Sequence, residues 1–347
     1  MTTPPEAKKS LNGGGCLAIT GGTGSFGRAM LRRVLSTDIA QIRVISRDED
    51  KQESLRREFP DSRINCVIAD VRDKDAIQLA LRGVNLVFHA AALKQVPTGE
   101  FFPSEVMKTN ALGSENVLRG CIENGVQKVV LLSTDKAVEP VNAMGITKAL
   151  MEKIGLAFAR MDEVETDIVI TRYGNVLCSR GSVVPKFVNQ VKDDLPLTIT
   201  NGAMTRFLMS LDEAIDLVIY AINSGRRGDT LVKQSPAATV QNLAIAVSTI
   251  LGRLDPKISE LGIRHGEKVH ESLLSAREFV NSTSQDGYFR IPISEQGNDF
   301  SEYFIKGEIK MTKDEGYTSS NTQQLSVTEI IDLLTNNYEF QRISGNL

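Results

Sequence analysis

Cysteine, histidine and long apolar runs are scarce in this sequence, and each shortage excludes a class of protein. The four cysteines lie fifty or more positions apart, and the 347 residues include three histidines. Cysteines without close pairs predict neither a zinc site nor a disulfide framework, and they favour a reduced, cytoplasmic setting. His265 and His270 have no third candidate ligand nearby, so we expect no metal. No run reaches the roughly 18 apolar residues of a membrane span, which predicts a soluble protein without a membrane partner.

An excess of positive charge is also absent. Lys and Arg number 40 against 43 Asp and Glu, which gives a net charge of −3 in a composition typical of globular proteins. A chain without a basic block offers no broad attraction to a polyanion, so we expect no nucleic-acid partner. Residues 1–15 are polar, rich in Pro and Gly, and lack the apolar core of a signal peptide. We predict that they form a flexible tail.

Short apolar runs alternate with segments of helical length between residues 16 and 177. The runs are rich in Val, Ile and Leu without polar alternation, which is typical of strands buried on both faces. They cover residues 16–20, 42–46, 64–69, 86–90, 129–133 and 168–171. This rhythm predicts an α/β fold, a doubly wound parallel sheet with helices on both faces.

The rhythm breaks after residue 177 into segments punctuated by Gly, Ser and Pro. Helix-like stretches lie near 211–224, 239–252 and 326–336, and residues 281–325 look irregular and polar. We therefore predict two domains after the tail, 16–177 for the doubly wound sheet and 178–347 for a smaller lobe. Part of 205–236 is expected to return to the first domain.

A glycine-rich segment follows the first expected strand. Residues 20–27 read TGGTGSFG and place Gly21, Gly24 and Gly27 in the spacing GxxGxxG before an amphipathic segment. Glycines permit a tight turn and a close backbone approach to a pyrophosphate, and the helix that follows presents its N–H groups and positive dipole end. We predict the dinucleotide loop of a Rossmann domain, and its other candidate contacts are Thr23, Ser25 and Phe26.

The residues after the second expected strand bear on the choice between NAD and NADP. An NAD site commonly has an acidic residue there for the ribose hydroxyls, whereas this chain has Ser46, Arg47 and Lys51 around Asp48. Arg as a planar fork and Lys as a point charge suit a 2′-phosphate, so the sequence favours NADP. The alternative is a solvated charged turn in which Asp48 takes the NAD role.

The ends of the third and fourth expected strands supply further candidate cofactor contacts. Asp70 and Val71 are placed to face an adenine, although an ordinary strand-end Asp is the alternative. Ala90 and Ala91 are small enough to let a cofactor pass close to the backbone. Lys94, four residues beyond Ala90, is a candidate for neutralising phosphate.

The fifth expected strand ends in Ser133, Thr134, Asp135 and Lys136. Ligands of an open α/β sheet bind beyond the carboxyl ends of its strands. A hydroxyl, a carboxylate and an amine that emerge together there are suited to proton transfer. Without the cofactor loop, the same four residues would be typical of a surface turn.

Six motifs in order carry a resemblance to a known family. They read TGGTGSFG, HAAALKQVP, STDKAVEPVNAMGITK, RYGNVLCSRGSVVP, MTRFLMS and RHGEK, and span roughly residues 16 to 275. The chain resembles the extended short-chain dehydrogenase/reductases, and among them the soluble, configuration-inverting UDP-N-acetylglucosamine 4,6-dehydratases of surface-polysaccharide pathways. The likeness is greatest to the capsular CapE-like branch and its O-antigen relatives, because it continues into TSSNTQQL at residues 318–325.

The resemblance implies a redox-neutral reaction on a nucleotide sugar. C4 of UDP-N-acetylglucosamine would be oxidised by a tightly bound NADP, water would be lost across C5–C6, and the same hydride would return to C6. A 4-keto sugar also has an acidic C3 hydrogen, so a 3-epimerase activity is a possible addition. The family further implies a homo-oligomer, suspected to be a hexamer. Residues 281–325 form a segment long enough to reach a neighbouring subunit.

One departure from the superfamily concerns its YxxxK motif. This chain has Met144 where the tyrosine stands, and Lys148 follows four residues later. A thioether cannot accept a proton. Met at this position is similar to what the CapE-like branch shows, so it argues for that branch and against a dehydrogenase or 4-epimerase that uses a tyrosinate. The alternatives are that Met144 only packs and that Lys148 is solvated.

The resemblance also implies roles for the strand-end residues. Asp135 would deliver a proton to the departing C6 hydroxyl, and Lys136 would exchange the C5 proton, for which we expect its pKa to be lowered. Thr134 would hydrogen-bond O4, and Lys148 would hold the nicotinamide ribose. Without the tyrosine, Asp135 or Lys136 must take the O4 proton, directly or through water.

The grip on UDP is assigned by the same resemblance. Asn175 matches a residue that contacts the nucleotide sugar, Thr198 and Thr200 match a strand that pairs with uracil, and arginines suit a diphosphate because their forks are bidentate. The full candidate set is Lys94, Asn175, Arg180, Ser182, Val183, Thr198, Thr200, Arg206, Arg264 and Glu267, with Val176 beside the cofactor.

Two other functions remain open at this point. A UDP-hexose 4-epimerase shares the cofactor and the UDP grip, and an NADP-binding regulatory protein needs neither acid nor base. The Asp135-Lys136 pair favours the dehydratase over both, because an epimerase requires no acid/base pair for C5 and C6.

Overall fold

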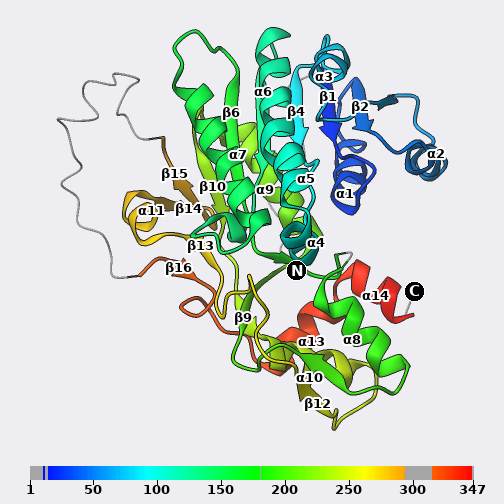
Figure 1. Cartoon of the computed structure of the whole chain (residues 1–347). Coiled ribbons are helices and arrows are strands. Elements are labelled where there is room, and N and C mark those ends of the chain that lie inside the picture. The colour runs from blue at the N-terminus through cyan, green and yellow to red at the C-terminus, as the bar shows by residue number, and fades with distance from the viewer. Residues whose placement is uncertain (1–10, 12–14, 180, 294–314, 346–347) are drawn as a thin grey trace.

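A nine-stranded sheet forms the centre of the computed structural model, which describes residues 11, 15–179, 181–293 and 315–345 (Figure 1). The strand order is β14-β15-β10-β6-β5-β4-β1-β2-β3. The parallel strands are β1 (Cys16–Thr20), β2 (Gln41–Ser46), β3 (Ile64–Ile68), β4 (Leu86–His89), β5 (Lys128–Leu132), β6 (Asp167–Arg172) and β10 (Thr230–Lys233). The predicted α/β fold with a doubly wound parallel sheet is confirmed.

Helices cover both faces of this sheet, and each layer has its own apolar core. One face packs against α1 (Ser25–Val34), α2 (Glu49–Glu58) and α9 (Leu211–Ser224), and the other packs against α3 (Lys74–Ala80), α6 (Gly113–Glu123) and α7 (Ala143–Arg160). Helix α9 joins the sheet although it follows the lobe's first segments in the chain. Burial of apolar side chains on both faces explains why the central strands carry no polar alternation.

Shorter helical segments follow β4 and β5 on the α7 side. They are α4 (Val96–Phe101), α5 (Pro103–Met107), the π-helical turn η1 (Lys108–Leu112), which leads into α6, and the 3₁₀ turn η2 (Asp135–Ala137). Helices α4 and α5 and turn η1 all contact α7. The chain after β4 therefore runs beside the helix that carries Met144 and Lys148.

Two described segments differ from the sequence-based expectations. Residues 283–291, placed in an irregular region, form the hairpin β14 (Thr283–Gln285) and β15 (Tyr288–Ile291), which extends the sheet antiparallel to β10. Asp286 and Gly287 at its turn have positive φ angles of 53° and 79°, which a two-residue hairpin turn requires. Leu11, placed in the flexible tail, is buried and packs in the core beside α1.

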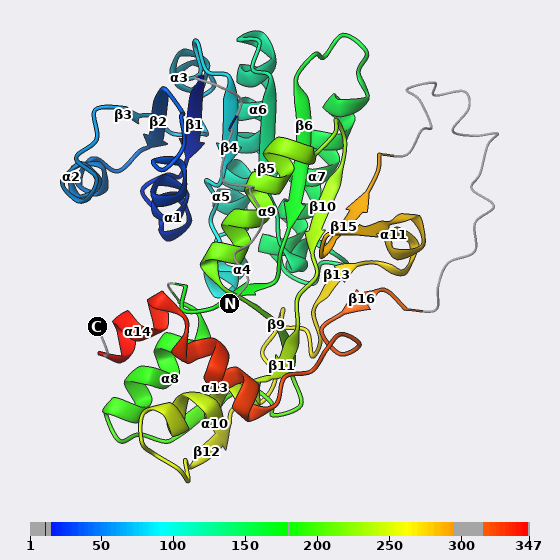
Figure 2. The same cartoon turned by 180° about the vertical axis from the view of Figure 1, so that it is seen from behind.

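A smaller lobe lies beyond the carboxyl ends of the parallel strands (Figures 1 and 2). Its core is built from α8 (Val183–Lys192), α10 (Val240–Ile250), α13 (Val327–Thr335) and α14 (Tyr338–Ser344), with the short strands β8 (Leu197–Ile199) and β12 (Ile258–Glu260). Helices α10 and α13 lie close to the predicted stretches 239–252 and 326–336. None of the helices in the described ranges is long and apolar enough to cross a membrane.

Small sheets connect this lobe to the large sheet. Strands β7 (Asn175–Val176), β9 (Thr205–Met209) and β11 (Ala237–Thr239) form one, and β13 (Ser272–Leu274) pairs with β16 (Tyr317–Thr318) in another. Helix α11 (Ala276–Asn281) follows β13. The C-terminal part of the chain is thereby brought back to the ends of β5 and β6.

A buried ion-pair network fixes that junction. The guanidinium of Arg172, at the end of β6, donates to both carboxylate oxygens of Glu152 on α7 (2.8 and 2.6 Å) and to Glu278 on α11 (2.9 and 2.8 Å). It also donates to the carbonyl of Leu273 in β13 (3.3 Å), and the Ser133 hydroxyl donates to Glu152 (2.5 Å). A buried charge must be paired, so these contacts tie the sheet, α7 and the C-terminal segment together.

We expect Glu152→Ala to destabilise the fold by about 3–5 kcal/mol, because it leaves the Arg172 charge buried with one partner fewer. Urea unfolding followed by circular dichroism measures this loss as a lower midpoint. Glu163→Ala, which removes an exposed glutamate after α7, is the control and should leave the midpoint unchanged. Equal midpoints for the two variants would contradict the structural role of the network.

Candidate active site

The turn between β1 and α1 has the geometry that the glycine-rich motif predicts. Gly21 has a φ of 67°, and a Cβ there would lie 2.9 Å from the Ala91 backbone at the end of β4. A Cβ on Gly27 would lie 2.2 Å from the carbonyl oxygen of Gly22. Both positions therefore require glycine, since no side chain fits. The turn brings β1, α1 and the β4 end into close contact.

The N-terminus of α1 has no side-chain cap. Gly24 is its N-cap residue, and Ser25 and Phe26 begin the helix behind Thr23, which is buried. An uncapped helix start offers backbone N–H groups and a positive dipole end to an anion. Together with the glycine turn, this is a cradle that fits the pyrophosphate of a dinucleotide.

The charged residues after β2 are engaged with one another. Asp48 is the N-cap of α2: its carboxylate accepts from the Lys51 backbone N–H (3.0 Å) and pairs with the Lys51 ammonium. These hydrogen bonds lower the pKa of Asp48. Arg47 lies 3.6 Å from Asp70, and the Ser46 hydroxyl accepts from the Gln52 amide (3.1 Å). Asp48 therefore caps the N-terminus of α2, and the cations Arg47 and Lys51 lie after the end of β2.

The other strand ends place the remaining predicted cofactor contacts differently. Asp70 accepts from the Arg72 guanidinium (2.6 Å), a hydrogen bond that lowers the pKa of Asp70. Val71 is buried against Gly113 of α6. Ala90 and Ala91 are partly exposed beside the glycine turn, whereas Lys94 is exposed.

A buried histidine explains how the ends of β1 and β4 stay together. The His89 ring hydrogen-bonds the Thr20 hydroxyl (2.7 Å) through Nδ1 and the Ser114 hydroxyl (2.8 Å) through Nε2. Burial lowers the pKa of His89 to about 3, so the ring is neutral at pH 7. This residue supports the turn and was not singled out from the sequence.

The predicted acid/base residues lie together after β5. The Thr134 hydroxyl donates to Asp135 Oδ1 (2.8 Å), and Lys136 Nζ donates to the same oxygen (3.0 Å). Asp135 is fully buried, and its Oδ2 has no hydrogen-bond partner among the described residues. One carboxylate oxygen is therefore held by two donors, and the other is held by none of the described residues.

A second carboxylate, which the sequence analysis missed, faces the same lysine. Glu271 Oε1 lies 3.4 Å from Lys136 Nζ and 3.8 Å from Arg206 Nε. Desolvation lowers the pKa of Lys136, but the charges of Asp135 and Glu271 outweigh it and the net pKa is raised. The expectation of a lowered pKa is therefore wrong for this structure, and Lys136 carries its proton.

Lys148 and Met144 are both buried on α7. The Lys148 ammonium donates to the carbonyl of Leu132 at the end of β5 (2.7 Å), and burial lowers the pKa of Lys148 to about 8. The interpretation of Lys148 as solvated is therefore wrong. Tyr173, at the end of β6, is no substitute base: burial, and then the charge of Asp135, raise the pKa of its phenol.

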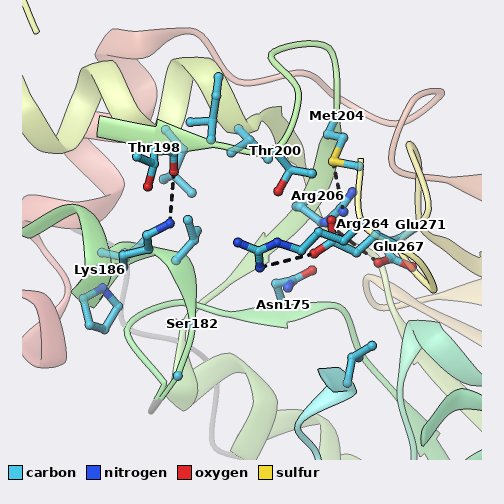
Figure 3. A pocket seen from close by; sticks show the side chains of 18 of the residues that line it. Asn175, Ser182, Lys186, Thr198, Thr200, Met204, Arg206, Arg264, Glu267 and Glu271 are labelled. Atoms are coloured by element: carbon cyan, nitrogen blue, oxygen red, sulfur yellow. Dashed lines mark hydrogen bonds and ion pairs between the residues drawn. The ribbon is translucent and has the colours of Figure 1, made fainter. Parts of the chain in front are cut away.

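A cavity of about 680 Å³ opens between the strand ends and the lobe (Figure 3). This volume suits a nucleotide-sized ligand. Of the predicted substrate contacts, Arg180 lies outside the described residues, and Lys94 does not line this cavity. The residues that do line the cavity are Asn175, Ser182, Val183, Thr198, Thr200, Arg206, Arg264 and Glu267, and Val176, predicted beside the cofactor, lines it as well.

Lys136 and Glu271 line the same cavity, and Lys136 connects it by a hydrogen bond to the buried carboxylate of Asp135. Its other basic side chains are Lys186, Arg206, Arg264 and Lys268, which suits a diphosphate. Figure 3 shows Arg206, Arg264 and Glu267 grouped near Asn175, with Lys186 and Thr198 farther along the cavity. Lys186 was also missed, because a lone lysine in a helix carries no sequence signal, and Lys268 was not singled out although it ends the RHGEK motif. No cluster of potential metal ligands occurs within the described ranges.

Known proteins share both the sequence and the fold. Residues 17–293 match the family described as polysaccharide biosynthesis protein, and residues 299–340 match its C-terminal counterpart. The chain is 52% identical over 323 residues to a UDP-glucose 4-epimerase of Rickettsia akari, covering 92% of this chain and 94% of the relative. A homologue in Rickettsia felis with the same name is 51% identical over 325 residues, covering 92% and 95%.

Solved structures agree on the architecture. Pen from Bacillus thuringiensis is 32% identical to this chain with a TM-score of 0.85. The match covers 94% of this chain and 99% of Pen. DesIV, a dTDP-glucose 4,6-dehydratase from Streptomyces venezuelae, is 23% identical with a TM-score of 0.65. The match covers 73% of this chain and 86% of DesIV, and at this identity it supports a shared fold only. The chain therefore belongs to the polysaccharide biosynthesis protein family, which consists of nucleotide-sugar-modifying enzymes of the extended short-chain dehydrogenase/reductase type.

Proposed function

We propose that this enzyme is a C5-inverting UDP-N-acetylglucosamine 4,6-dehydratase that makes a 4-keto-6-deoxy sugar for surface polysaccharide. The observation that carries the proposal is the pair Asp135 and Lys136, of which Lys136 lines the large cavity and donates to the buried carboxylate of Asp135 (3.0 Å). A buried methionine, Met144, stands in place of the usual tyrosine. Elimination across C5–C6 needs an acid and a base at that point of the sugar, and this pair supplies both. A 3-epimerase activity at the same 4-keto sugar stays a part of the proposal.

The chain's own residues fit an NADP cofactor. The glycine turn and the uncapped start of α1 would hold the pyrophosphate, Arg47 and Lys51 the 2′-phosphate, and Lys148 the nicotinamide ribose. When bound, the nicotinamide supplies reversible oxidation, taking a hydride from C4 and returning it to C6. The remaining steps are cleavage of the C6–O bond as water leaves and the proton transfers that accompany it, and acid/base residues of the protein would carry them.

The protonation state of Lys136 determines which residue accepts the O4 proton in the first step. An ammonium with a raised pKa is not a base in the free enzyme, whereas Asp135 Oδ2 accepts no hydrogen bond from any described residue. We infer that Asp135 accepts the O4 proton during oxidation and gives it to the C6 hydroxyl as that group leaves as water. Thr134 would hydrogen-bond O4. Lys136 would release its proton to solvent, accept the C5 proton as the neutral amine, and return a proton to C5 from the resulting ammonium.

UDP recognition in this proposal uses the far part of the cavity. Arg206 and Arg264 would clamp the diphosphate, Glu267 the ribose, and Thr198 and Thr200 the uracil edge. Gln190 on α8 donates to the Thr198 hydroxyl (2.8 Å), so α8 holds strand β8, which carries Thr198. Arg264 lies 3.9 Å from Glu267, which keeps both side chains at the cavity wall.

A UDP-hexose 4-epimerase is the second candidate, favoured by the name that the Rickettsia relatives carry. An epimerase returns the hydride to C4 and needs no acid at C6. Met144 stands where the tyrosine of such an enzyme is expected, and the raised pKa of Tyr173 argues against Tyr173 as a tyrosinate for the C4 hydroxyl. The mass of the product separates the two reactions.

Incubation of the purified enzyme with UDP-N-acetylglucosamine alone should give a product lighter by one water, because the cofactor is recycled within each turnover. Mass spectrometry of the nucleotide sugar measures this. An epimer of unchanged mass would establish the second candidate, and no change at all would leave a binding protein. Incorporation of solvent deuterium at C5 and C3, read by NMR, reports the stereochemistry and any 3-epimerisation.

Asp135→Asn and Lys136→Ala should each lower the rate of water loss by about 10²–10⁴-fold, the usual contribution of a general acid or base. Steady-state kinetics at saturating substrate measures it, with Glu163→Ala as the control. Normal turnover in both site variants would refute the assigned roles.

Arg47→Ala should weaken NADP binding by about tenfold or more while changing NAD binding little, because it removes a charge-assisted contact to the 2′-phosphate alone. Calorimetry of the nucleotide-free protein with each cofactor measures both affinities. Arg57→Ala, an exposed arginine farther along α2, is the matched control. Equal losses for NADP and NAD would point to Asp48 and an NAD site.

A homo-oligomer, expected to be a hexamer, completes the proposal. Large apolar side chains are exposed on the helices after β4 and on α7, namely Phe101, Phe102, Leu112, Ile146 and Leu150. Such a surface marks an interaction site. Sedimentation should therefore show a particle several times the mass of one chain, and Phe102→Glu should shift it to smaller species. A wild-type monomer would contradict this part of the proposal.

A further inference from the structure

Glu271 is a buried carboxylate that none of the sequence motifs includes. It lies three residues beyond the RHGEK motif, immediately before β13, and is 3% exposed. The residue lines the large cavity, and its Oε2 has no hydrogen-bond partner among the described residues. A buried carboxylate with an unpartnered oxygen is costly to keep, so its presence calls for a function.

The C-terminal segment fixes the backbone of Glu271 on both sides. Its N–H donates to the Ser319 hydroxyl (2.9 Å), and its carbonyl accepts from the Ser319 N–H (2.8 Å). The same hydroxyl hydrogen-bonds the Thr205 hydroxyl (2.7 Å) and donates to the Thr205 carbonyl (3.1 Å) in β9. Ser319 is fully buried, so a residue far along the chain determines where Glu271 stands.

The carboxylate of Glu271 stands between two cations that face the cavity. Its Oε1 lies 3.4 Å from Lys136 Nζ and 3.8 Å from Arg206 Nε. Asp135 holds the same ammonium at 3.0 Å from the other side. Lys136 is therefore placed between two carboxylates that come from η2 and from the segment before β13.

We propose that Glu271 is a positioning residue of the acid/base group, holding the Lys136 ammonium beside Asp135 and governing when that amine exchanges its proton. The inference rests on the proposed function for its catalytic meaning. With Glu271 as a second anion, Lys136 keeps its proton until the substrate arrives, and the free oxygen of Asp135 stays available. The C-terminal segment, through Ser319, then contributes to the reaction without touching the substrate.

The charges that face Lys136 determine the sign of the effect. Asp135 and Glu271 favour the ammonium, whereas Arg206 on β9 and burial oppose it. Lys268, on the loop before Glu271, is a further cation of the same group, and its own pKa is lowered, mainly by burial. Loss of Glu271 leaves one anion against the two cations, so the pKa of Lys136 must fall.

Glu271→Gln tests this without changing the size of the side chain. Competitive acetylation of the whole protein across a pH series, with mass-spectrometric quantification of the Lys136 peptide, gives the protonation midpoint of that amine. We expect the midpoint to fall by about one pH unit or more, the usual effect of an opposite charge at this distance. Ser319→Ala should shift it in the same direction by less, and Glu271→Asp should restore part of it.

The kinetic counterpart is a pH profile of water loss. The limb that reports Lys136 should move to lower pH in Glu271→Gln, and kcat at the optimum should fall about tenfold or more, because the amine loses one of the two carboxylates that position it. Glu329→Gln, which neutralises a surface glutamate in the first turn of α13, controls for the loss of one charge and should move neither readout.

An unshifted Lys136 midpoint in a folded Glu271→Gln would overturn the inference, and Ser319→Ala provides the same test if the first variant unfolds. Acetylation needs no substrate, so the outcome is independent of the proposed reaction. A shifted midpoint in an enzyme that releases no water would leave the Lys136–Glu271 coupling intact and refute the dehydratase alone.

Discussion

The pairing of charges removed from water determines how the two parts of this protein meet. Arg172 at the end of β6 is buried, and the nearest way to satisfy its guanidinium is to bring Glu152 from α7 and Glu278 from α11 to it. Desolvation of such groups costs several kcal/mol per ion unless partners replace the water. Because the partners come from opposite sides of the junction, satisfying the charge also fixes β13 and the segment before it.

The same requirement produces the acid/base group one strand away. Lys136 follows β5, and its neighbours Asp135 and Glu271 come from a 3₁₀ turn and from the end of the segment that Arg172 helps to hold. Parallel strands end at one edge of the sheet, so the glycine turn after β1, the alanines after β4 and this group face the same region. The lobe covers that edge and leaves the cavity between them.

The sequence predicted those features that depend on local pattern. Buried apolar runs gave the parallel strands, and GxxGxxG gave a turn in which Gly21 and Gly27 admit no Cβ. Features that depend on distant partners were missed. Glu271 comes to Lys136 through pairing of β13 with β16 and through Ser319, and neither contact has a spacing that a sequence displays. The pKa of Lys136 was predicted in the wrong direction for the same reason, because Glu271 was not in view.

The raised pKa of Lys136 changes the proposed order of the proton transfers. In the proposed reaction, a lysine that keeps its proton is not the first base, and Asp135, whose Oδ2 has no hydrogen-bond partner among the described residues, is the group proposed for that step. A carboxylate that takes the O4 proton is then the acid that the C6 hydroxyl needs, and one proton serves both steps. Met144 fits this scheme, since a tyrosinate at its place would compete with Asp135 for the same hydroxyl. Under the same proposal, the anion at Glu271 would keep Lys136 protonated during oxidation at C4, which would separate that step from proton exchange at C5.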